Sequence, residues 1–220
     1  MKVEILSFSA VSSDDIRVTF AVGDGEHESK ESFVISAEAY TEMGLRRGES
    51  STDVYEAVER ESEIYSAFKR CVASLAYGAC SASMMISKLR AKGISASVAA
   101  EAVQRATERG YIDEIEGAKR EAQRCLAKLW GESRIRARLF EKRYSKEAID
   151  KALFYLEDSG VDFDESCRRL IDARYETIPD NPEDMRRLMS AVCRQGYSIS
   201  QIKNACLSLR EKKRLDSIYK

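Results

Sequence analysis

The sequence predicts a mainly helical protein, a tandem array of three three-helix repeat units behind a small antiparallel β-rich N-terminal extension. One apolar pattern recurs three times, at offsets of about 50 and then 53 residues, which is a period typical of helical repeat arrays. Charged residues make up 33% of the chain and Pro only 2 of 220 residues, a composition that suits surface-rich helices. Strand-like alternation of apolar and polar residues is concentrated near the N-terminus.

The repeated pattern is anchored at Leu89, Leu139 and Val192. In each copy, Gly or Arg follows four residues later, then an aliphatic or aromatic residue, then Ser. The same frame includes Met85, Ile135 and Leu188 before the anchor, and Ala99/Ala102/Val103, Ile149/Ala152/Leu153 and Ile202/Ala205/Cys206 after it. We expect these residues to be buried in equivalent places. An array of this kind exposes a long surface that usually binds another macromolecule.

The N-terminal extension, residues 1–50, is predicted to form a small antiparallel sheet followed by a short helix. Apolar residues alternate with others from Ile16 to Val22, which is the period of a half-buried strand. Gly23–Asp24–Gly25 has turn chemistry, and Phe33–Val34–Ile35 reads as the returning strand. Two further expectations concern the ends of this region: Val3, Ile5 and Phe8 add a third strand, and Ser36 caps a helix that ends near Gly44.

Helical periodicity continues from Thr52 to the C-terminus. We predict a connecting helical segment over 51–80 and repeat units over 81–130, 131–178 and 179–220, the third truncated. Side-chain oxygens at helix starts satisfy otherwise unpaired backbone N–H groups. The predicted helix starts are Ser81, Ser95 and Asp113, then Gly131 or Ser133, Ser145 and Asp162, then Asn181 before Pro182, and Ser198 with Gln201 as a capping box.

Charge is distributed unevenly along the chain, although the formal net charge is only −1. Residues 1–60 carry 13 Asp/Glu and 6 Lys/Arg, whereas the other 160 residues carry 24 acids and 30 bases. An acidic N-terminal part before a basic remainder indicates a charged partner, with ordinary solvated faces as the alternative.

The cysteines and the N-terminus indicate a soluble cytoplasmic protein. The six cysteines, at positions 71, 80, 125, 167, 193 and 206, form no CxxC pair, and His27 is the one histidine. This spacing argues against a zinc site, and we expect no metal and no cofactor. Small buried thiols in a reducing compartment are the simpler interpretation. The N-terminus lacks the apolar core of a signal peptide, and no apolar run approaches transmembrane length, so we expect no membrane association.

A dense basic cluster is the main candidate binding site. Its members are Arg134, Arg136, Arg138, Lys142, Arg143 and Lys146, which lie within 13 residues that contain one acid, Glu141. On a helix, Arg134, Arg138 and Lys142 share a face, away from Ile135 and Leu139. Such a face can neutralise phosphates or meet an acidic protein groove, and a merely solvated face is the alternative. A second candidate cluster near the C-terminus comprises Lys212, Lys213, Arg214 and Lys220.

Catalytic interpretations have simpler alternatives. The acidic residues at 113–114 and 162–165 could pair as catalytic carboxylates, but helix capping explains them directly. Cys125 and Cys167 have no histidine nearby in sequence to activate them. Trp130 can stack on a base or fill core. Because P-loop, GxGxxG and HExxH motifs are also absent, we expect no enzyme.

Two segments resemble the signature of the RecX family of bacterial recombination regulators. The first is Gly110–Tyr–Ile–Asp–Glu114 followed by Ala118, and the second is Trp130–Gly131–Glu–Ser–Arg134–Ile135 with Leu139. The stretch from Phe33 to Gly48 resembles the N-terminal extension of that family. The chain departs from the family at 78–81, where many relatives carry two arginines, at Glu114 and Gly117, where a second Asp and a Phe are frequent, and at Arg143, where Gly is common.

The resemblance implies a regulatory function. RecX-like proteins bind the RecA recombinase, largely in the groove of its filament on single-stranded DNA, and limit strand exchange, ATP hydrolysis and co-protease activity. It therefore implies a monomeric cytoplasmic regulator of homologous recombination, DNA repair and the SOS response. The first alternative is a helical-repeat protein that binds single- or double-stranded DNA without a RecA role, and the second is a small helical enzyme. Steep salt dependence without RecA would indicate the first alternative.

Overall fold

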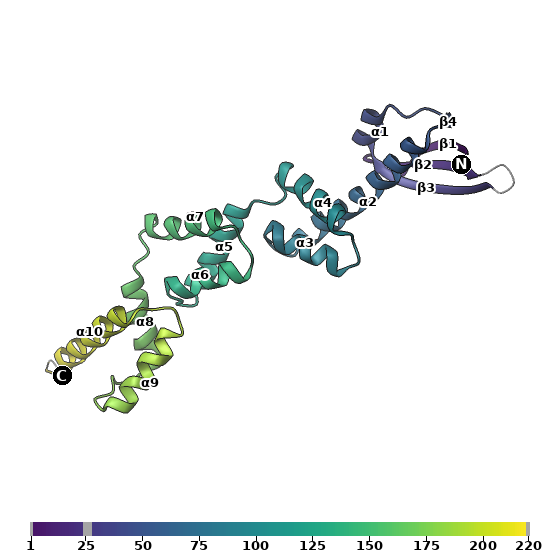
Figure 1. Ribbon diagram of the computed structural model, residues 1–220. Helices are drawn as coiled ribbons and strands as arrows, with labels where there is room; N and C mark the ends of the chain where they lie inside the picture. The colour runs from purple at the N-terminus through teal and green to yellow at the C-terminus, as the bar shows by residue number, and fades with distance from the viewer. Residues whose placement is uncertain (1, 24–27, 219–220) are drawn as a thin grey trace. The chain divides into compact units, whose positions relative to one another are not determined.

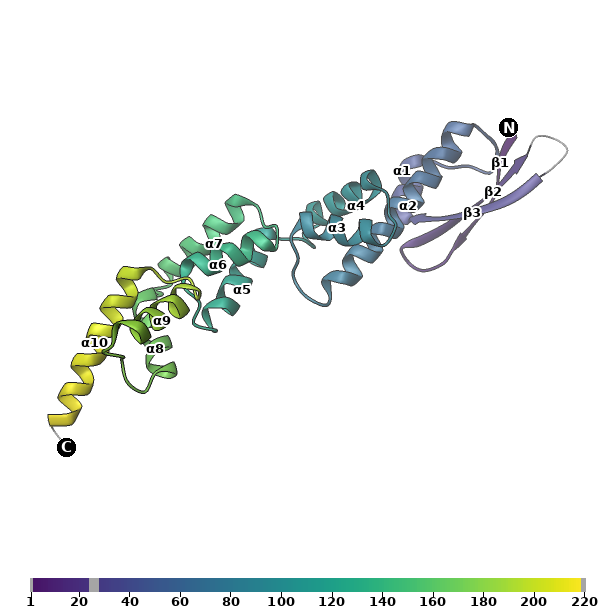
Figure 2. The same cartoon turned by 60° about the horizontal axis from the view of Figure 1, so that its bottom comes forward.

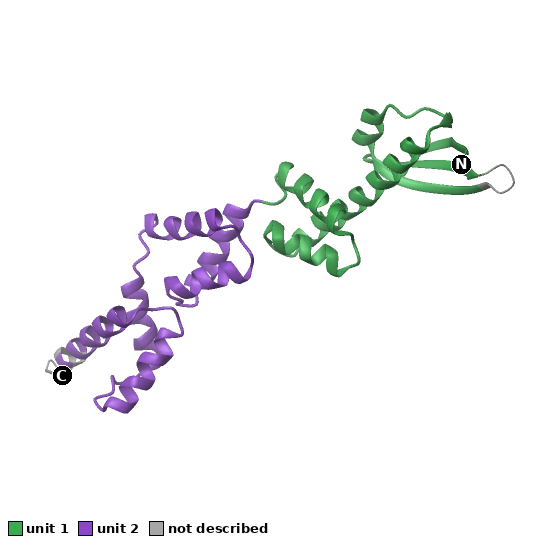
Figure 3. Cartoon of the chain, viewed as in Figure 1, with its two compact units in different colours: residues 1–112 green, residues 113–220 purple. Residues whose placement is uncertain are grey.

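The computed structural model describes residues 2–23 and 28–218, which form two compact units, residues 1–112 and 113–220 (Figure 3). Ten helices and four strands make up the described part of the chain, so the predicted fold class is confirmed. The predicted turn residues Asp24 and Gly25, together with His27, lie outside the described residues. Over the described ranges, we find no helix whose length and apolar character would let it cross a bilayer.

Unit 1 opens with the predicted antiparallel sheet. Its strands are β1 (Lys2–Ala10), β2 (Asp15–Gly23), β3 (Glu28–Ser36) and β4 (Gly48–Ser50), in the order β3-β2-β1-β4 (Figure 1). Helix α1 (Ala37–Met43) begins where the Ser36 hydroxyl accepts a hydrogen bond from the Ala39 N–H at 3.1 Å. It ends at Gly44, whose φ of 58° lies in the left-handed region that glycine adopts without strain.

Helix α2 (Thr52–Leu75) belongs to two cores in succession. Its first half packs on the sheet through Tyr55 and Val58. Its second half, including Phe68 and Cys71, packs with α3 (Ala82–Ala91) and α4 (Ala96–Glu108) (Figure 1 and Figure 2). The predicted connecting segment is therefore the first helix of a three-helix core.

Unit 2 contains two further three-helix cores. The first is built from α5 (Glu114–Leu126), α6 (Glu132–Glu141) and α7 (Lys146–Asp158). The second is built mainly from α8 (Phe163–Arg174), α9 (Pro182–Cys193) and α10 (Ile199–Ile218). Each core thus begins one helix earlier than the expected unit boundaries at residues 81, 131 and 179, because α2, α5 and α8 each pack with the two helices that follow them.

The repeated apolar positions are buried as predicted. Leu89, Leu139 and Val192 are 2%, 0% and 0% exposed, and the other residues of the repeat frame are buried with them. The predicted caps also form in the structure. Ser198 and Gln201 exchange hydrogen bonds of 3.2 and 2.9 Å, the reciprocal pattern of a capping box. At the start of α6 the cap is Gly131 rather than Ser133.

Candidate partner-binding surface

The main basic cluster lies on and around α6. This helix buries Ile135 and Leu139 completely and carries its charged residues on the remaining faces. The sequence therefore predicted its amphipathic character correctly. The cations nevertheless differ in their surroundings, and those surroundings decide which of them can meet a partner.

Arg134 lies at the junction between the two cores of unit 2. Its guanidinium centre is 3.8 Å from the centroid of the Trp130 ring, and it donates a hydrogen bond to the side-chain carbonyl of Gln195. Trp130 itself is partly buried against the core of α5, α6 and α7. Arg134 and Trp130 thus hold the junction together, which the spacing of basic residues in the sequence did not indicate.

The same junction depends on a close approach of two glycines. The Gly131 N–H donates to the Gln195 carbonyl at 2.7 Å, and the Tyr197 hydroxyl donates to the Leu129 carbonyl at 3.0 Å. A Cβ atom on Gly131 would stand 2.4 Å from the Gly196 carbonyl oxygen, closer than any real contact. Only glycine therefore fits here, because the two backbones touch.

Glu121 on α5 forms ion pairs with three basic residues of this region. Its side chain is 8% exposed and lies 2.8 Å from Lys142, 3.0 Å from Arg124 and 3.5 Å from Arg138. Burial by itself raises the pKa of Glu121, but the hydrogen bond from Lys142 and the neighbouring positive charges outweigh it and lower the pKa. Lys142 and Arg138 are accordingly held by an internal carboxylate.

Arg136 connects α6 to α7. It forms an ion pair of 2.8 Å with Asp150 and a longer one of 3.7 Å with Glu132. All three side chains are about half exposed, so the pairs are solvated and contribute little to stability. Arg136 can therefore turn toward a partner at small cost.

The outermost residues form what we call the α6 patch: Arg136, Phe140, Arg143 and Lys146. Phe140 is 74% exposed, one helical turn after Arg136 and out of phase with the buried Ile135 and Leu139. Arg143 and Lys146 are both exposed, and the Arg143 N–H donates to the Phe140 carbonyl at 2.8 Å. Phe140 was not among the candidate residues from the sequence, although its phase relative to Ile135 and Leu139 marks it as outward-facing.

Arg143 has an unusual backbone. Its φ is 57°, whereas the equivalent positions in the repeat frame are Gly93 and Gly196, with φ of 85° and 96°. A side chain in the left-handed region costs free energy that glycine does not. Arg143 therefore occupies a backbone position that glycine would occupy without this cost.

The second basic cluster lies on α10. Lys212 and Arg214 are exposed near the end of this helix. The side chain of Lys213 and all of Lys220 lie outside the described residues. The structure thus places two of the predicted cations in solvent-accessible positions.

The remaining polar candidates have structural roles. Asp113 and Asp162 accept hydrogen bonds from backbone N–H groups that start α5 and α8, at 2.9 and 2.8 Å. Cys125 and Cys167 are buried, and burial raises the pKa of the Cys167 thiol to about 12. Among the described residues, no group of three or more His, Cys, Asp or Glu could hold a metal ion.

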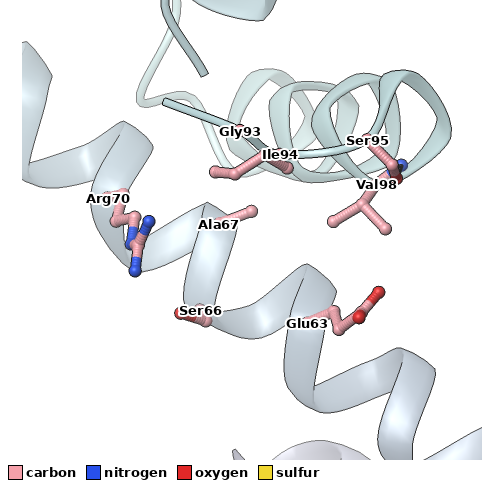
Figure 4. A pocket seen from close by; sticks show the side chains of 8 residues that line it. All are labelled: Glu63, Ser66, Ala67, Arg70, Gly93, Ile94, Ser95 and Val98. Carbon is pink, nitrogen blue, oxygen red and sulfur yellow. Dashed lines mark hydrogen bonds between the residues drawn. The ribbon is translucent and has the colours of Figure 1, made fainter. Parts of the chain in front are cut away.

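Unit 1 contains a hollow of about 300 Å³ between α2 and the turn that joins α3 to α4 (Figure 4). Glu63, Ser66 and Arg70 line it from α2, and Gly93 to Ser95 with Val98 line it from the other side. Neither histidine nor cysteine is among these lining residues. Ser66 and Ser95 supply hydroxyl groups and Glu63 a carboxylate, and no hydrogen bond joins these three side chains among the described residues.

These features define the class of protein: a helical-repeat protein with a β-rich N-terminal extension. The chain is similar to the crystal structure of a regulatory protein RecX, with 18% identity and a TM-score of 0.72, over 92% of this chain and 99% of that one. It is also similar to RecX from Lactobacillus salivarius, with 17% identity and a TM-score of 0.57, over 67% of this chain and 97% of that one. No protein-family model and no curated protein matches the sequence. The chain thus has the fold of the RecX structures.

Proposed function

We propose that this chain is a RecX-family regulator that binds the RecA recombinase and its single-stranded-DNA filament and modulates, mainly by inhibition, recombination, ATP hydrolysis and co-protease activity. The observation that carries the proposal is the shared fold, which extends over 92% of this chain and 99% of a RecX chain. The order of the RecX-like sequence motifs along the chain supports it independently.

In this proposal the protein acts in the cytoplasm, as a monomer and without enzymatic activity of its own. It affects homologous recombination, DNA repair and the SOS response through its contact with RecA. The α6 patch is the proposed contact, assisted by the cations of α10. An exposed aromatic residue among arginines has the composition of an interface hot spot, and the arginines can pair with acidic groups or phosphates.

The second candidate function is direct binding of nucleic acid without RecA. Phe140 favours it, since an exposed ring next to cations can stack on a base while Arg136 and Arg143 meet the backbone phosphates. The two functions differ in their dependence on salt and on RecA. Binding dominated by phosphates weakens steeply with salt and needs no recombinase.

Co-sedimentation separates the two candidates. RecA filaments assembled on single-stranded DNA with a slowly hydrolysed ATP analogue, bare single-stranded DNA, and RecA alone would each be incubated with the chain over a series of salt concentrations. We expect the chain to pellet with filaments at moderate salt. At the same salt concentration it should no longer bind bare single-stranded DNA. Equal binding to bare DNA and to filaments, lost in parallel as salt rises, would favour the nucleic-acid alternative and contradict the RecA role.

A further inference from the structure

Helices α9 and α10 line an apolar groove of about 280 Å³ within unit 2. Its lining residues are Met185, Met189, Ile202, Lys203, Cys206, Leu207 and Arg210. Leu207 is 64% exposed, and Met185 and Met189 are only partly buried. Methionine side chains adapt their shape to an apolar ligand, which suits a binding groove.

The equivalent place in the preceding core is occupied by an ion pair between two side chains. With the 53-residue offset of the repeat, Met185, Met189 and Lys203 correspond to Glu132, Arg136 and Asp150. There, Arg136 bridges α6 and α7 through its 2.8 Å ion pair with Asp150. Between α9 and α10, methionine and lysine stand at the bridging positions, so this pair cannot form. The groove lies where the preceding core has its ionic bridge, and Met189 and Lys203 stand in place of Arg136 and Asp150.

The edge of the groove is positively charged. Lys203 and Arg210 flank Leu207 along α10, one turn to either side of it, and Lys203 is exposed. Arg210 is held by Asp180 at 3.0 Å, whereas Lys203 has no ion pair with any of the described residues. Residues 182–218 together carry eight Lys/Arg and four Asp/Glu. An occupant with apolar residues along one side and carboxylates beside them would complement this surface.

We propose that this groove binds an amphipathic helix of a partner protein, whose apolar side inserts between Met189 and Leu207 and whose acidic residue pairs with Lys203. A helix laid in a groove presents apolar residues at successive turns, and the groove between two helices matches that geometry. Lys203 stands at the position of Asp150 in the preceding core with the opposite charge, so the partner's carboxylate would play the part that Arg136 plays there. This surface is separate from the α6 patch and does not depend on the RecA role.

The test uses a synthetic helical peptide with leucines along one face and glutamates beside them, and a matched peptide with lysines in place of the glutamates. Methyl-labelled methionine in the full chain provides the readout by NMR. We expect the glutamate peptide to shift the Met185 and Met189 signals and leave Met84 and Met85 of unit 1 unchanged. It should bind at least about tenfold more tightly than the lysine peptide, a difference of about 1.4 kcal/mol.

A closure variant tests the groove itself. Met189→Arg with Lys203→Asp introduces the ionic bridge of the preceding core, and we expect it to weaken binding of the glutamate peptide about tenfold or more. Leu207→Gln changes an exposed residue and should weaken binding without disturbing the fold, while Phe154→Ala, at the equivalent position of α7, should have no effect. Filament co-sedimentation of Leu207→Gln should equal that of the wild type, which separates this inference from the RecA proposal.

Three outcomes would overturn the inference. The first is equal binding of the two peptides, which would reduce the groove to a non-selective apolar surface. The second is unchanged peptide binding by Leu207→Gln and by the closure variant. The third is a shift of the Met185 and Met189 signals with protein concentration alone, which would identify a second copy of the chain as the occupant.

Discussion

Glu121 decides how much of the basic cluster around α6 is available to a partner. Its buried carboxylate holds Lys142, Arg124 and Arg138 within 3.5 Å, and Arg134 is held separately by Trp130 and Gln195. Replacing Arg134, Arg138 and Lys142 together would therefore disturb internal contacts as well as any external one. The proposed binding contact is better tested at the α6 patch, whose residues lie outside these internal contacts of Glu121 and Arg134.

Replacing Glu121 by Gln should destabilise the protein by about 1–3 kcal/mol, because the amide removes the charge that compensates three cations around a buried position. Urea denaturation followed by circular dichroism measures the change. Glu141→Gln is the matched control, since Glu141 pairs with Arg138 but is 66% exposed. It should cost no more than about 0.5 kcal/mol. Equal effects of the two substitutions would contradict the structural role of Glu121.

The lowered pKa of Glu121 also predicts a dependence of stability on pH. The carboxyl has a lower pKa in the folded chain than its ordinary value of 4.5, so the folded state favours its ionised form. Its contribution is fully present above pH 4.5 and is lost as pH falls from that value through the folded-state pKa. Wild type should therefore lose more stability than Glu121→Gln over this acidic range. Parallel stability curves for the two proteins would count against the prediction.

Arg143→Gly should separate stability from binding. Glycine relieves the left-handed backbone at this position, so we expect stability to be unchanged or to rise by up to about 1 kcal/mol. Filament binding should weaken because the α6 patch loses a cation. Thermal unfolding measures the first effect and co-sedimentation with filaments the second. A variant that is less stable than the wild type but binds filaments equally well would show that Arg143 stabilises the fold instead.

Single residues differ in how well the sequence predicted them. The caps Ser145 and Asp162 were predicted because a cap acts on backbone groups two or three residues away. The contact of Arg134 with Gln195 joins residues far apart in sequence, which no local pattern encodes. Phe140 could have been found from the sequence, since helical phase relative to Ile135 and Leu139 places it on the outward side of α6.

At the scale of helices, periodicity predicted which face of each helix is buried but not which helices pack together. The helix at 114–126 was assigned to the unit before it, whereas it packs with α6 and α7. A repeated pattern defines a period, and the period alone does not say where a unit begins. The starting point is decided by tertiary packing, as in α2, which serves both the sheet and a helical core.

The junction between the two cores of unit 2 makes a prediction at this scale. Gly131→Ala should destabilise the protein by about 1–3 kcal/mol, since its Cβ would stand 2.4 Å from a backbone oxygen and one helix would have to move. In the variant, hydrogen exchange should become faster at the backbone N–H of residue 131, which in the wild type donates a hydrogen bond to the Gln195 carbonyl. Ser133→Ala, an exposed change in the first turn of the same helix, is the control. Unaltered exchange and stability in Gly131→Ala would refute the close contact.

At the scale of the whole chain, two distinct surfaces follow from one repeated architecture. The α6 patch and the groove between α9 and α10 occupy successive copies of the same three-helix frame, and both result from substitutions at surface positions of that frame. The repeat conserves the buried residues and leaves the outward ones free to differ. The period therefore predicted the fold class, whereas the chemistry of each surface required the structure.

We propose above all that this chain regulates RecA through the α6 patch. The most direct measurement is ATP hydrolysis by RecA on single-stranded DNA, recorded against increasing concentrations of the wild type, Phe140→Ala and Phe154→Ala. Phe154 is the matched control because its ring is 66% exposed on α7 and lies outside the patch. We predict that the wild type and Phe154→Ala inhibit equally, whereas Phe140→Ala needs roughly 10–30 times more protein, the loss of a hot spot worth about 2 kcal/mol. Undiminished hydrolysis in the presence of excess wild-type protein would contradict the account.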